Sequence, residues 1–242
     1  MLEWFTKLEN KKNRKFIQFD IQSYYPSISK ELLMNALKWA EQYADITSID
    51  KAIILHTRKS FLFHANRTWK KRGANADFDV AMGAYDSAEV SDLTGLYLLH
   101  ELNGVINISE NGGLYRDDGL LAMEGNGSSL EKTKKLIIQT FKNHGLKIDG
   151  NIICTKSTDF LDVTLNLENG TYKPFNKPNK RIVYISRESN HPPVIIKNMP
   201  ALIQKRISNL SSNQDIFEES KEPYESALKL SLIHICRCRR RG

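Results

Sequence analysis

The sequence has 242 residues, of which 40% are hydrophobic and 26% charged, which suffices for one large domain or two small ones with a buried core. No segment reaches the roughly 18 to 20 apolar residues that a membrane span requires, and the polar, lysine-rich segment 1–14 lacks the apolar centre of a secretion signal. The three cysteines show no zinc-like spacing within the fold and predict no disulfide framework. We therefore expect an intracellular protein, cytoplasmic or nuclear, and neither a secreted nor a membrane protein.

In chain order, residues 16–22 alternate between apolar and polar side chains, which predicts a strand with Asp20 on its polar face. The apolar spacing over 30–44 predicts a helix with Ser29 as its N-cap. Residues 49–64 show no single pattern: 53–55 could be the end of a helix, and 60–64 could be a strand. The polar and basic residues 65–77 predict an exposed hairpin or loop.

The second half of the chain begins with helical spacing over 87–102, followed by predicted strands at 105–109 and 113–123. Ser128 and Glu131 have the spacing of a capping box and predict a helix over 129–143 that stops at Gly145. Further strands are expected near 151–155, 159–167 and 171–175. The prolines beyond residue 173 predict that the chain forms only short segments of secondary structure there, with one more helix starting over 203–210.

This order of elements fits an α+β fold of the ferredoxin-like βαββαβ type, an antiparallel sheet with helices on one face. Asp117 and Asp118 then lie at the tip of a hairpin, and Asp20 lies near the end of a strand. Two carboxylates about 4 Å apart repel by roughly 4 kcal/mol at an effective dielectric constant near 20. Converging carboxylates therefore raise their pKa values or hold divalent cations. Ordinary turn and strand-end aspartates are the alternative.

Five motifs in order resemble the palm of reverse transcriptases, the RNA-directed DNA polymerases of retroelements, Penelope-like or related. The first is an Asp followed five residues later by an aromatic, over 19–25, and the second is Met82-Gly83 with the helix after it. The third is the Tyr-x-Asp-Asp box over 115–118, and the fourth and fifth lie over 141–148 and 160–163. Together with a later run over 172–192, the likeness covers about residues 14–229.

The resemblance implies a nucleotidyltransferase that adds deoxynucleotides to a primer 3′-hydroxyl. Its partners would be an RNA template, a DNA primer and a dNTP. Asp20 and Asp117 would hold two Mg²⁺ ions, with Asp118 supporting and Mn²⁺ as a possible substitute.

Other site residues follow from the same resemblance. Tyr25 would lie under the incoming sugar and exclude a 2′-hydroxyl, and Gly83 and Tyr115 would also contact the nucleotide. Lys156, or alternatively Lys147, would protonate the leaving pyrophosphate. For Tyr25 a place in the core is the alternative, and for either lysine an ordinary solvated side chain.

Two basic groups are expected to follow the phosphate backbone, so that binding weakens with salt. Arg58 is one of the basic residues expected to contact phosphates. The aromatic residues Tyr172, Phe175 and Tyr184 lie between basic residues in the sequence and would stack on bases. The two groups that we expect to bind nucleic acid are Arg67, Lys70, Lys71 and Arg72, and Lys173, Lys177, Lys180 and Arg181.

The resulting map has a basic N-terminal segment (1–15), a palm (16–168) with partial fingers (about 45–80), and a connection to a truncated thumb (169–229). Only 19 residues precede Asp20, so we expect a fragment of a larger polymerase with weak or no activity alone. Arg116 within the third motif, and Ala81-Met82 before Gly83, depart from the family pattern. A family B DNA-directed polymerase palm and an inactive nucleic-acid-binding remnant are the alternatives.

The C-terminal segment 230–242 resembles the translation of a transposase-end sequencing adapter. Without its four arginines the formal net charge of +7 falls to +3. We therefore expect a non-native tail and leave it out of the predictions of fold and function. A basic tail that binds nucleic acid and a Cys-x-Cys metal site are the other interpretations.

Overall fold

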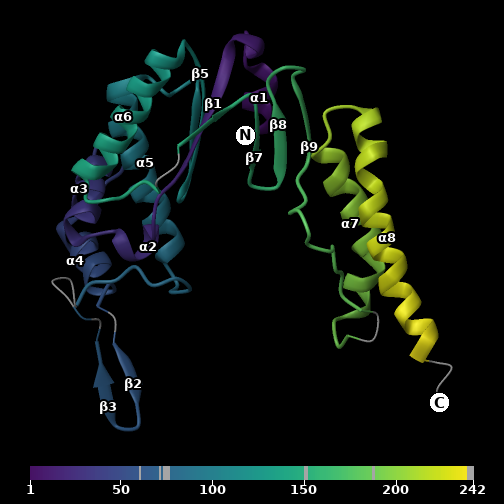
Figure 1. Cartoon of the computed structure of the whole chain (residues 1–242). Coiled ribbons are helices and arrows are strands. Elements are labelled where there is room, and N and C mark those ends of the chain that lie inside the picture. Colours follow the sequence, from purple (N-terminus) through teal and green to yellow (C-terminus); the bar gives the residue numbers. More distant parts are fainter. Residues whose placement is uncertain (60, 71, 73–76, 150–151, 187–188, 239–242) are drawn as a thin grey trace. The chain divides into compact units, whose positions relative to one another are not determined.

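The computed structural model of the chain describes residues 1–59, 61–70, 72, 77–149, 152–186 and 189–238 (Figure 1). It divides into two compact units, Met1–Thr155 and Lys156–Gly242. The division precedes the boundary that the sequence predicts after residue 168, so the predicted fifth motif lies in the second unit.

The first unit contains most of the helices and one larger sheet. Its helices are α1 (Leu2–Lys7), α2 (Tyr24–Ser27), α3 (Lys30–Ala40), α4 (Ser48–His56), α5 (Ser87–Ile106) and α6 (Gly127–Asn143), with a 3₁₀ turn at Lys11–Asn13. Its strands are β1 (Arg14–Asp20), β2 (Leu62–His64), β3 (Arg67–Trp69), β4 (Gly112–Tyr115), β5 (Asp118–Glu124) and β6 (Ile153–Thr155).

The larger sheet has the strand order β4-β5-β1-β6, and each neighbouring pair is antiparallel. Helices α2 to α5 and the small β2–β3 hairpin lie between β1 and β4 in the chain, and α6 lies between β5 and β6. This is a βαββαβ order with an insertion, in which β1 and β5 are the central strands. The predicted mixed α+β fold with antiparallel sheets is confirmed.

The core of the first unit lies against one face of β1. Ile17, Phe19 and Ile21 are at most 3% exposed, and they belong to one cluster with buried residues of α3, α5 and α6. Asp20 is exposed, as the alternation of the sequence predicts. Strand alternation therefore puts α3, α5 and α6 on one side of β1 and the carboxylate on the other.

The helix ends of the first unit agree with one prediction from the sequence and differ from two others. Ser29 caps α3 by accepting a hydrogen bond from the Leu32 amide at 3.0 Å, as predicted. The predicted strand at 105–109 is wrong, because α5 continues to Ile106. The predicted capping box is also wrong: Asn126 caps α6 by accepting a hydrogen bond from the Ser129 amide at 2.9 Å, so the helix begins before Ser128.

The second unit combines a small sheet with two long helices. The antiparallel strands β7 (Ser157–Phe160), β8 (Val163–Asn166) and β9 (Thr171–Pro174) precede α7 (Pro193–Asn209) and α8 (Gln214–Cys238). The expected break-up of the chain by proline is wrong for α7, which begins at Pro193 and continues through Pro200. The backbone of α8 also continues into the expected non-native tail.

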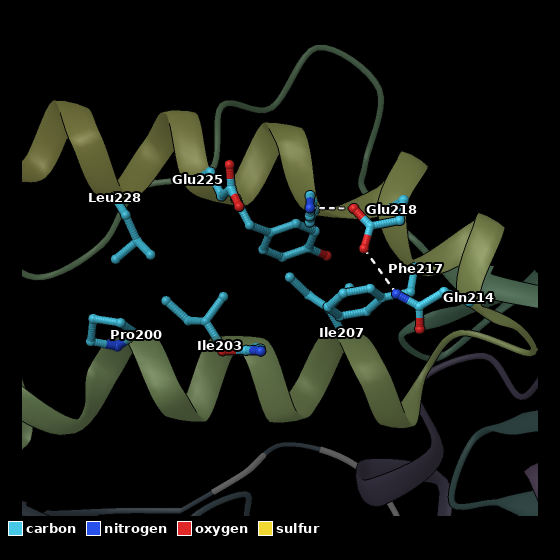
Figure 2. Close-up of a pocket in the computed structure, with 11 residues that line it drawn as sticks. Pro200, Ile203, Ile207, Gln214, Phe217, Glu218, Glu225 and Leu228 are labelled. Carbon is cyan, nitrogen blue, oxygen red and sulfur yellow. Dashed lines mark hydrogen bonds and ion pairs between the residues drawn. The ribbon is translucent and has the colours of Figure 1, made fainter.

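A cavity of about 470 Å³ lies between α7 and α8 (Figure 2). Ile203, Ile207 and Phe217 point into it, and Lys221 and Gln214 bind the carboxylate of Glu218 at its rim. Its walls are therefore the apolar faces of two helices, with charged side chains paired at the edge. Among the described residues, no helix is both long and apolar enough to cross a membrane.

A buried arginine ties the segment before α5 to the end of α4. The Arg58 side chain is 1% exposed, and its Nη2 contacts the Asp86 carboxylate and lies 3.2 Å from the Thr57 hydroxyl. Its carbonyl accepts a hydrogen bond from the Asp79 amide at 2.8 Å. The predicted contact of Arg58 with a phosphate backbone is therefore wrong, because this guanidinium is inside the fold.

Removing the counter-ion of Arg58 should destabilise the protein. We expect Asp86→Ala to lower the free energy of unfolding by roughly 2 to 4 kcal/mol, because a buried charge loses its partner. Asp86 makes no side-chain cap bond to α5, so loss of a cap does not confound the result. Urea denaturation measures the change. Asp77→Ala is the control, because it breaks only the exposed Lys70–Asp77 pair and should cost about 0.5 kcal/mol or less. Equal effects would contradict the assigned role.

Close packing of Phe19 on Gly119 joins the two central strands of the larger sheet. The two residues lie opposite each other, and a Cβ at Gly119 would lie 2.2 Å from Cζ of the Phe19 ring. The same ring packs edge-on against Phe141, with the ring centroids 5.5 Å apart. Gly119 lies within β5, so it serves strand packing and is not part of the turn.

A methyl group at Gly119 should therefore be costly. We expect Gly119→Ala to lower the free energy of unfolding by about 2 to 3 kcal/mol, because the Phe19 ring must move within a packed core. Gly95→Ala is the matched control: its Cβ would meet only the Tyr24 hydroxyl, at 3.5 Å, and alanine favours the helix by up to about 1 kcal/mol. Thermal and urea unfolding of both variants measure the difference. Similar stabilities would show that the core accommodates the methyl group.

Candidate active site

The pairing of β1 with β5 brings the three predicted aspartates together. Asp20 is the last residue of β1, and it lies directly opposite Asp118, the first residue of β5. The Cβ atoms of such a pair are typically about 4.5 to 5.5 Å apart, with both side chains on one face. The Ile21 amide donates a hydrogen bond to the Asp117 carbonyl at 2.9 Å. The pairing therefore continues past Asp20 and holds Asp117 beside it.

A tight turn sets the position of Asp117. Tyr115 pairs with Asp118, so the loop between β4 and β5 has two residues, Arg116 and Asp117. Arg116 has a φ of 57°, the left-handed conformation that tight hairpin turns require at the first of these positions. Its Nε lies 3.5 Å from the carboxylate of Asp92 on α5. Arg116 therefore has a counter-ion of its own on a neighbouring helix.

Burial and the neighbouring carboxylates raise the pKa values of Asp20 and Asp118. Burial, then repulsion from Asp117 and Asp149, raises the pKa of Asp20 above its ordinary value. Burial, then repulsion from Asp117 and Asp20, raises the pKa of Asp118. Ionising all of these groups at once costs free energy, and a cation placed among them would recover it.

The donor set suits Mg²⁺ in its chemistry. Mg²⁺ takes one or two carboxylates and completes its shell with water and substrate phosphate oxygens, and this cluster offers carboxylates at an exposed strand end. Over the part of the chain that the structure describes, no three His, Cys, Asp or Glu side chains form a group that could hold a metal ion. The fit to Mg²⁺ therefore rests on the carboxylate chemistry alone, and the binding of ions here stays a prediction.

A fourth aspartate lies at this end of β1, and the sequence analysis missed it. The Asp149 amide donates a hydrogen bond to the Asp20 carbonyl, and the Gln22 amide donates one to the Lys147 carbonyl, both at 2.8 Å. The segment after α6 thus extends the sheet beside Asp20. Alternation of apolar and polar residues over 146–149 is the sequence signal that could have found it. Lys147, one of the two predicted general acids, is exposed in this segment.

The two tyrosines after β1 have different environments. Tyr24 is buried and donates a hydrogen bond from its hydroxyl to the Ser91 carbonyl at 2.8 Å, and burial raises its pKa. Tyr25 is half-buried and packs edge-on against Tyr24, with centroids 6.0 Å apart. Tyr25, followed by Asp92, raises the pKa of Arg116. Tyr24 thus belongs to the core, and Tyr25 packs against that core from its edge, toward the hairpin that carries Asp117.

The other two predicted nucleotide contacts are exposed. Tyr115 ends β4 next to the turn. Gly83 has a φ of 88°, and nothing lies within 4 Å of a Cβ built there. Its backbone conformation is therefore sufficient reason for a glycine, and its contact with a nucleotide remains a prediction.

The two predicted basic groups belong to different units, and Lys156 belongs to a different unit from the carboxylates. Lys156 begins the second unit, where its carbonyl accepts a hydrogen bond from the Leu167 amide at 2.9 Å. Lys71 lies outside the described residues. The remaining predicted nucleic-acid contacts are all exposed: Arg67, Lys70 and Arg72 in the first unit, and Lys173, Lys177, Lys180 and Arg181 in the second. Tyr172, Phe175 and Tyr184 are half-buried.

Neutralising Asp118 should stabilise the fold at neutral pH. A carboxyl group whose pKa is raised in the folded state favours folding fully at pH values below its ordinary pKa near 3.8. This contribution to the free energy of unfolding is lost as the pH rises through the pKa of the folded state. Asp118→Asn should therefore have a higher Tm than the unmodified protein at pH 7 without divalent cations, and the gap should close toward pH 3.5. Asp45→Asn, at an exposed position, controls for net charge. A gap that persists unchanged at low pH would contradict the repulsion.

Comparison with known proteins gives a structural likeness only. No protein-family model and no curated protein sequence matches the chain. A telomerase from Candida albicans, solved with a fragment of telomeric RNA, is similar with a TM-score of 0.66 and 15% identity, over 98% of this chain and 42% of that one. An apo telomerase from Candida tropicalis is similar with a TM-score of 0.51 and 15% identity, over 72% of this chain and 39% of that one. The chain thus spans less than half the length of either, and it shares the fold of part of telomerase, a reverse transcriptase.

Proposed function

We propose that this chain is the catalytic palm of an RNA-directed DNA polymerase of a retroelement, which adds deoxynucleotides to a primer 3′-hydroxyl. The observation that carries the proposal is the strand pairing that places Asp20 opposite Asp118, with Asp117 in the adjoining turn. The fold that the chain shares with part of telomerase supports it. That telomerase was solved with a fragment of telomeric RNA, which supports binding of nucleic acid by this chain.

Each residue of the site has a defined part in this proposal. Asp20 and Asp117 would hold two Mg²⁺ ions, with Asp118 supporting. Bound Mg²⁺ would lower the pKa of the primer hydroxyl and neutralise charge on the triphosphate. Tyr25 would exclude a 2′-hydroxyl from its place beside the hairpin, and Tyr115 would contact the nucleotide from the other side of the turn.

Primer extension tests the proposal. The purified chain, with a DNA primer on an RNA template and either Mg²⁺ or Mn²⁺, should add deoxynucleotides slowly. Asp117→Asn should lower the rate at least about 100-fold, since losing one ligand of the ions that stabilise the transition state costs about 3 kcal/mol or more. Asp45→Asn carries the same change of charge at an exposed position and should retain the rate.

Metal binding gives a second readout that does not depend on turnover. Mg²⁺ should raise the Tm of the unmodified protein and of Asp45→Asn, and the rise should be much smaller for Asp117→Asn. Because the fragment is expected to be weak or inactive alone, absence of extension together with absence of an Asp117-dependent rise in Tm would contradict the proposal and leave a nucleic-acid-binding remnant. Faster extension on a DNA template than on RNA would instead indicate a DNA-directed polymerase.

A further inference from the structure

The turn between β4 and β5 carries a cation whose hydrogen-bonding capacity is incompletely used. Arg116 is half-buried, and its Nε lies 3.5 Å from Oδ1 of Asp92 on α5, which is the separation of an ion pair. This Nε is closed to solvent and, among the described residues, has no hydrogen-bond partner of normal geometry. Asp92 therefore offsets the charge of the guanidinium but leaves one of its five N–H groups without an acceptor.

Arg116 lies among the residues that would receive the nucleotide. Its Cζ lies 5.7 Å from the centroid of the Tyr115 ring, and Asp117 is the next residue along the turn. Tyr25, ahead of Asp92, raises the pKa of Arg116, which places the Tyr25 hydroxyl near the guanidinium. A planar cation is therefore held beside both the sugar-contacting tyrosine and the carboxylates of the proposed site.

The pair between Arg116 and Asp92 can be exchanged for another partner at low cost. Both side chains are partly open to solvent, at 36% and 58%, and an ion pair of this kind contributes little to stability. A guanidinium can form two parallel hydrogen bonds with a phosphate group, and such charge-assisted bonds are roughly twice as strong as neutral ones. A phosphate group that enters this site would therefore displace Asp92 from Arg116.

We propose that Arg116 binds the triphosphate of the incoming nucleotide, and that Asp92 holds the guanidinium until the nucleotide arrives. The triphosphate is the anion expected here because Asp117, the neighbouring residue, would hold an ion of the pair that carries it. Arg116 departs from the reverse transcriptase pattern, so this contact is particular to this chain. The inference rests on the proposed function and adds one nucleotide-binding residue to it.

Isothermal titration calorimetry with dATP and Mg²⁺ tests the proposal. The protein is first bound to an RNA template whose annealed DNA primer ends in a dideoxynucleotide, so that no turnover occurs. Arg116→Gln should weaken dATP binding roughly 10-fold, because charge-assisted hydrogen bonds to phosphate are lost. Arg116→Lys should recover only part of this loss, since an ammonium group lacks the planar fork. Asp92→Asn should tighten binding about 3-fold, because Arg116 no longer has to leave a carboxylate.

A double substitution separates exchange of partners from a general loss of negative charge. In the Arg116→Gln background, Asp92→Asn should change the affinity for dATP by less than about 1.5-fold, whereas a long-range effect of charge would tighten binding equally in both backgrounds. Glu89→Gln removes another exposed carboxylate from α5 and should leave the affinity unchanged. Inorganic tripolyphosphate should compete with dATP, and Arg116→Gln should weaken its binding by the same factor. Circular dichroism and Tm establish that each variant is folded.

Three results would overturn this inference. One is an affinity of Arg116→Gln for dATP within about 2-fold of that of the unmodified protein. Another is weaker binding by Asp92→Asn, which would make the ion pair a support for the turn. The last is unchanged binding of tripolyphosphate by Arg116→Gln, which would assign the contact to the sugar or the base. All three would leave the carboxylate site standing, because that site is tested separately by extension and by the rise in Tm with Mg²⁺ that depends on Asp117.

Discussion

Like charges placed opposite each other at the end of an antiparallel ladder are the constraint on which the candidate site depends. Asp20 and Asp118 repel, and directly opposed like charges weaken a strand pair. The pair persists because the opposite face of the same strand is buried: Ile17, Phe19 and Ile21 lie in the core, and each such side chain contributes about 1.5 to 3 kcal/mol on burial. Hydrophobic packing on one side of β1 thus sustains an electrostatically unfavourable arrangement on the other.

Helix α5 holds the two ends of this arrangement through consecutive residues. The carbonyl of Ser91 accepts the hydrogen bond from Tyr24, just after β1, and the carboxylate of Asp92 pairs with Arg116 in the hairpin turn. Arg58 and Asp86 in turn anchor the start of the same helix. Helix α5, anchored by the end of α4, therefore holds both of the strands that carry the carboxylates in place.

Features that depend on neighbouring residues could be predicted from the sequence, and those that depend on distant ones could not. Period-two alternation gave the two faces of β1, and the Ser29 cap follows from a contact only three residues along the chain. The sequence predicts a break at Pro200, but α7 continues through it because packing against α8 outweighs the low helix propensity of proline. Arg58 and Asp149 took their roles from partners that only the fold brings close, Asp86 for the first and the end of β1 for the second.

The two-residue turn at Arg116 and Asp117 is an exception to the rule that hairpin turns at the protein surface tolerate insertions. Hairpin tips ordinarily accept extra residues, because little packing depends on them. Here the left-handed conformation of Arg116 closes the shortest loop that can join β4 to β5, and the pairing with β1 begins at the very next residue. One inserted residue would shift Asp118 out of line with Asp20, and a shift by one along a strand turns a side chain to the opposite face. Length at this half-buried turn is therefore as strictly limited as volume is in the core.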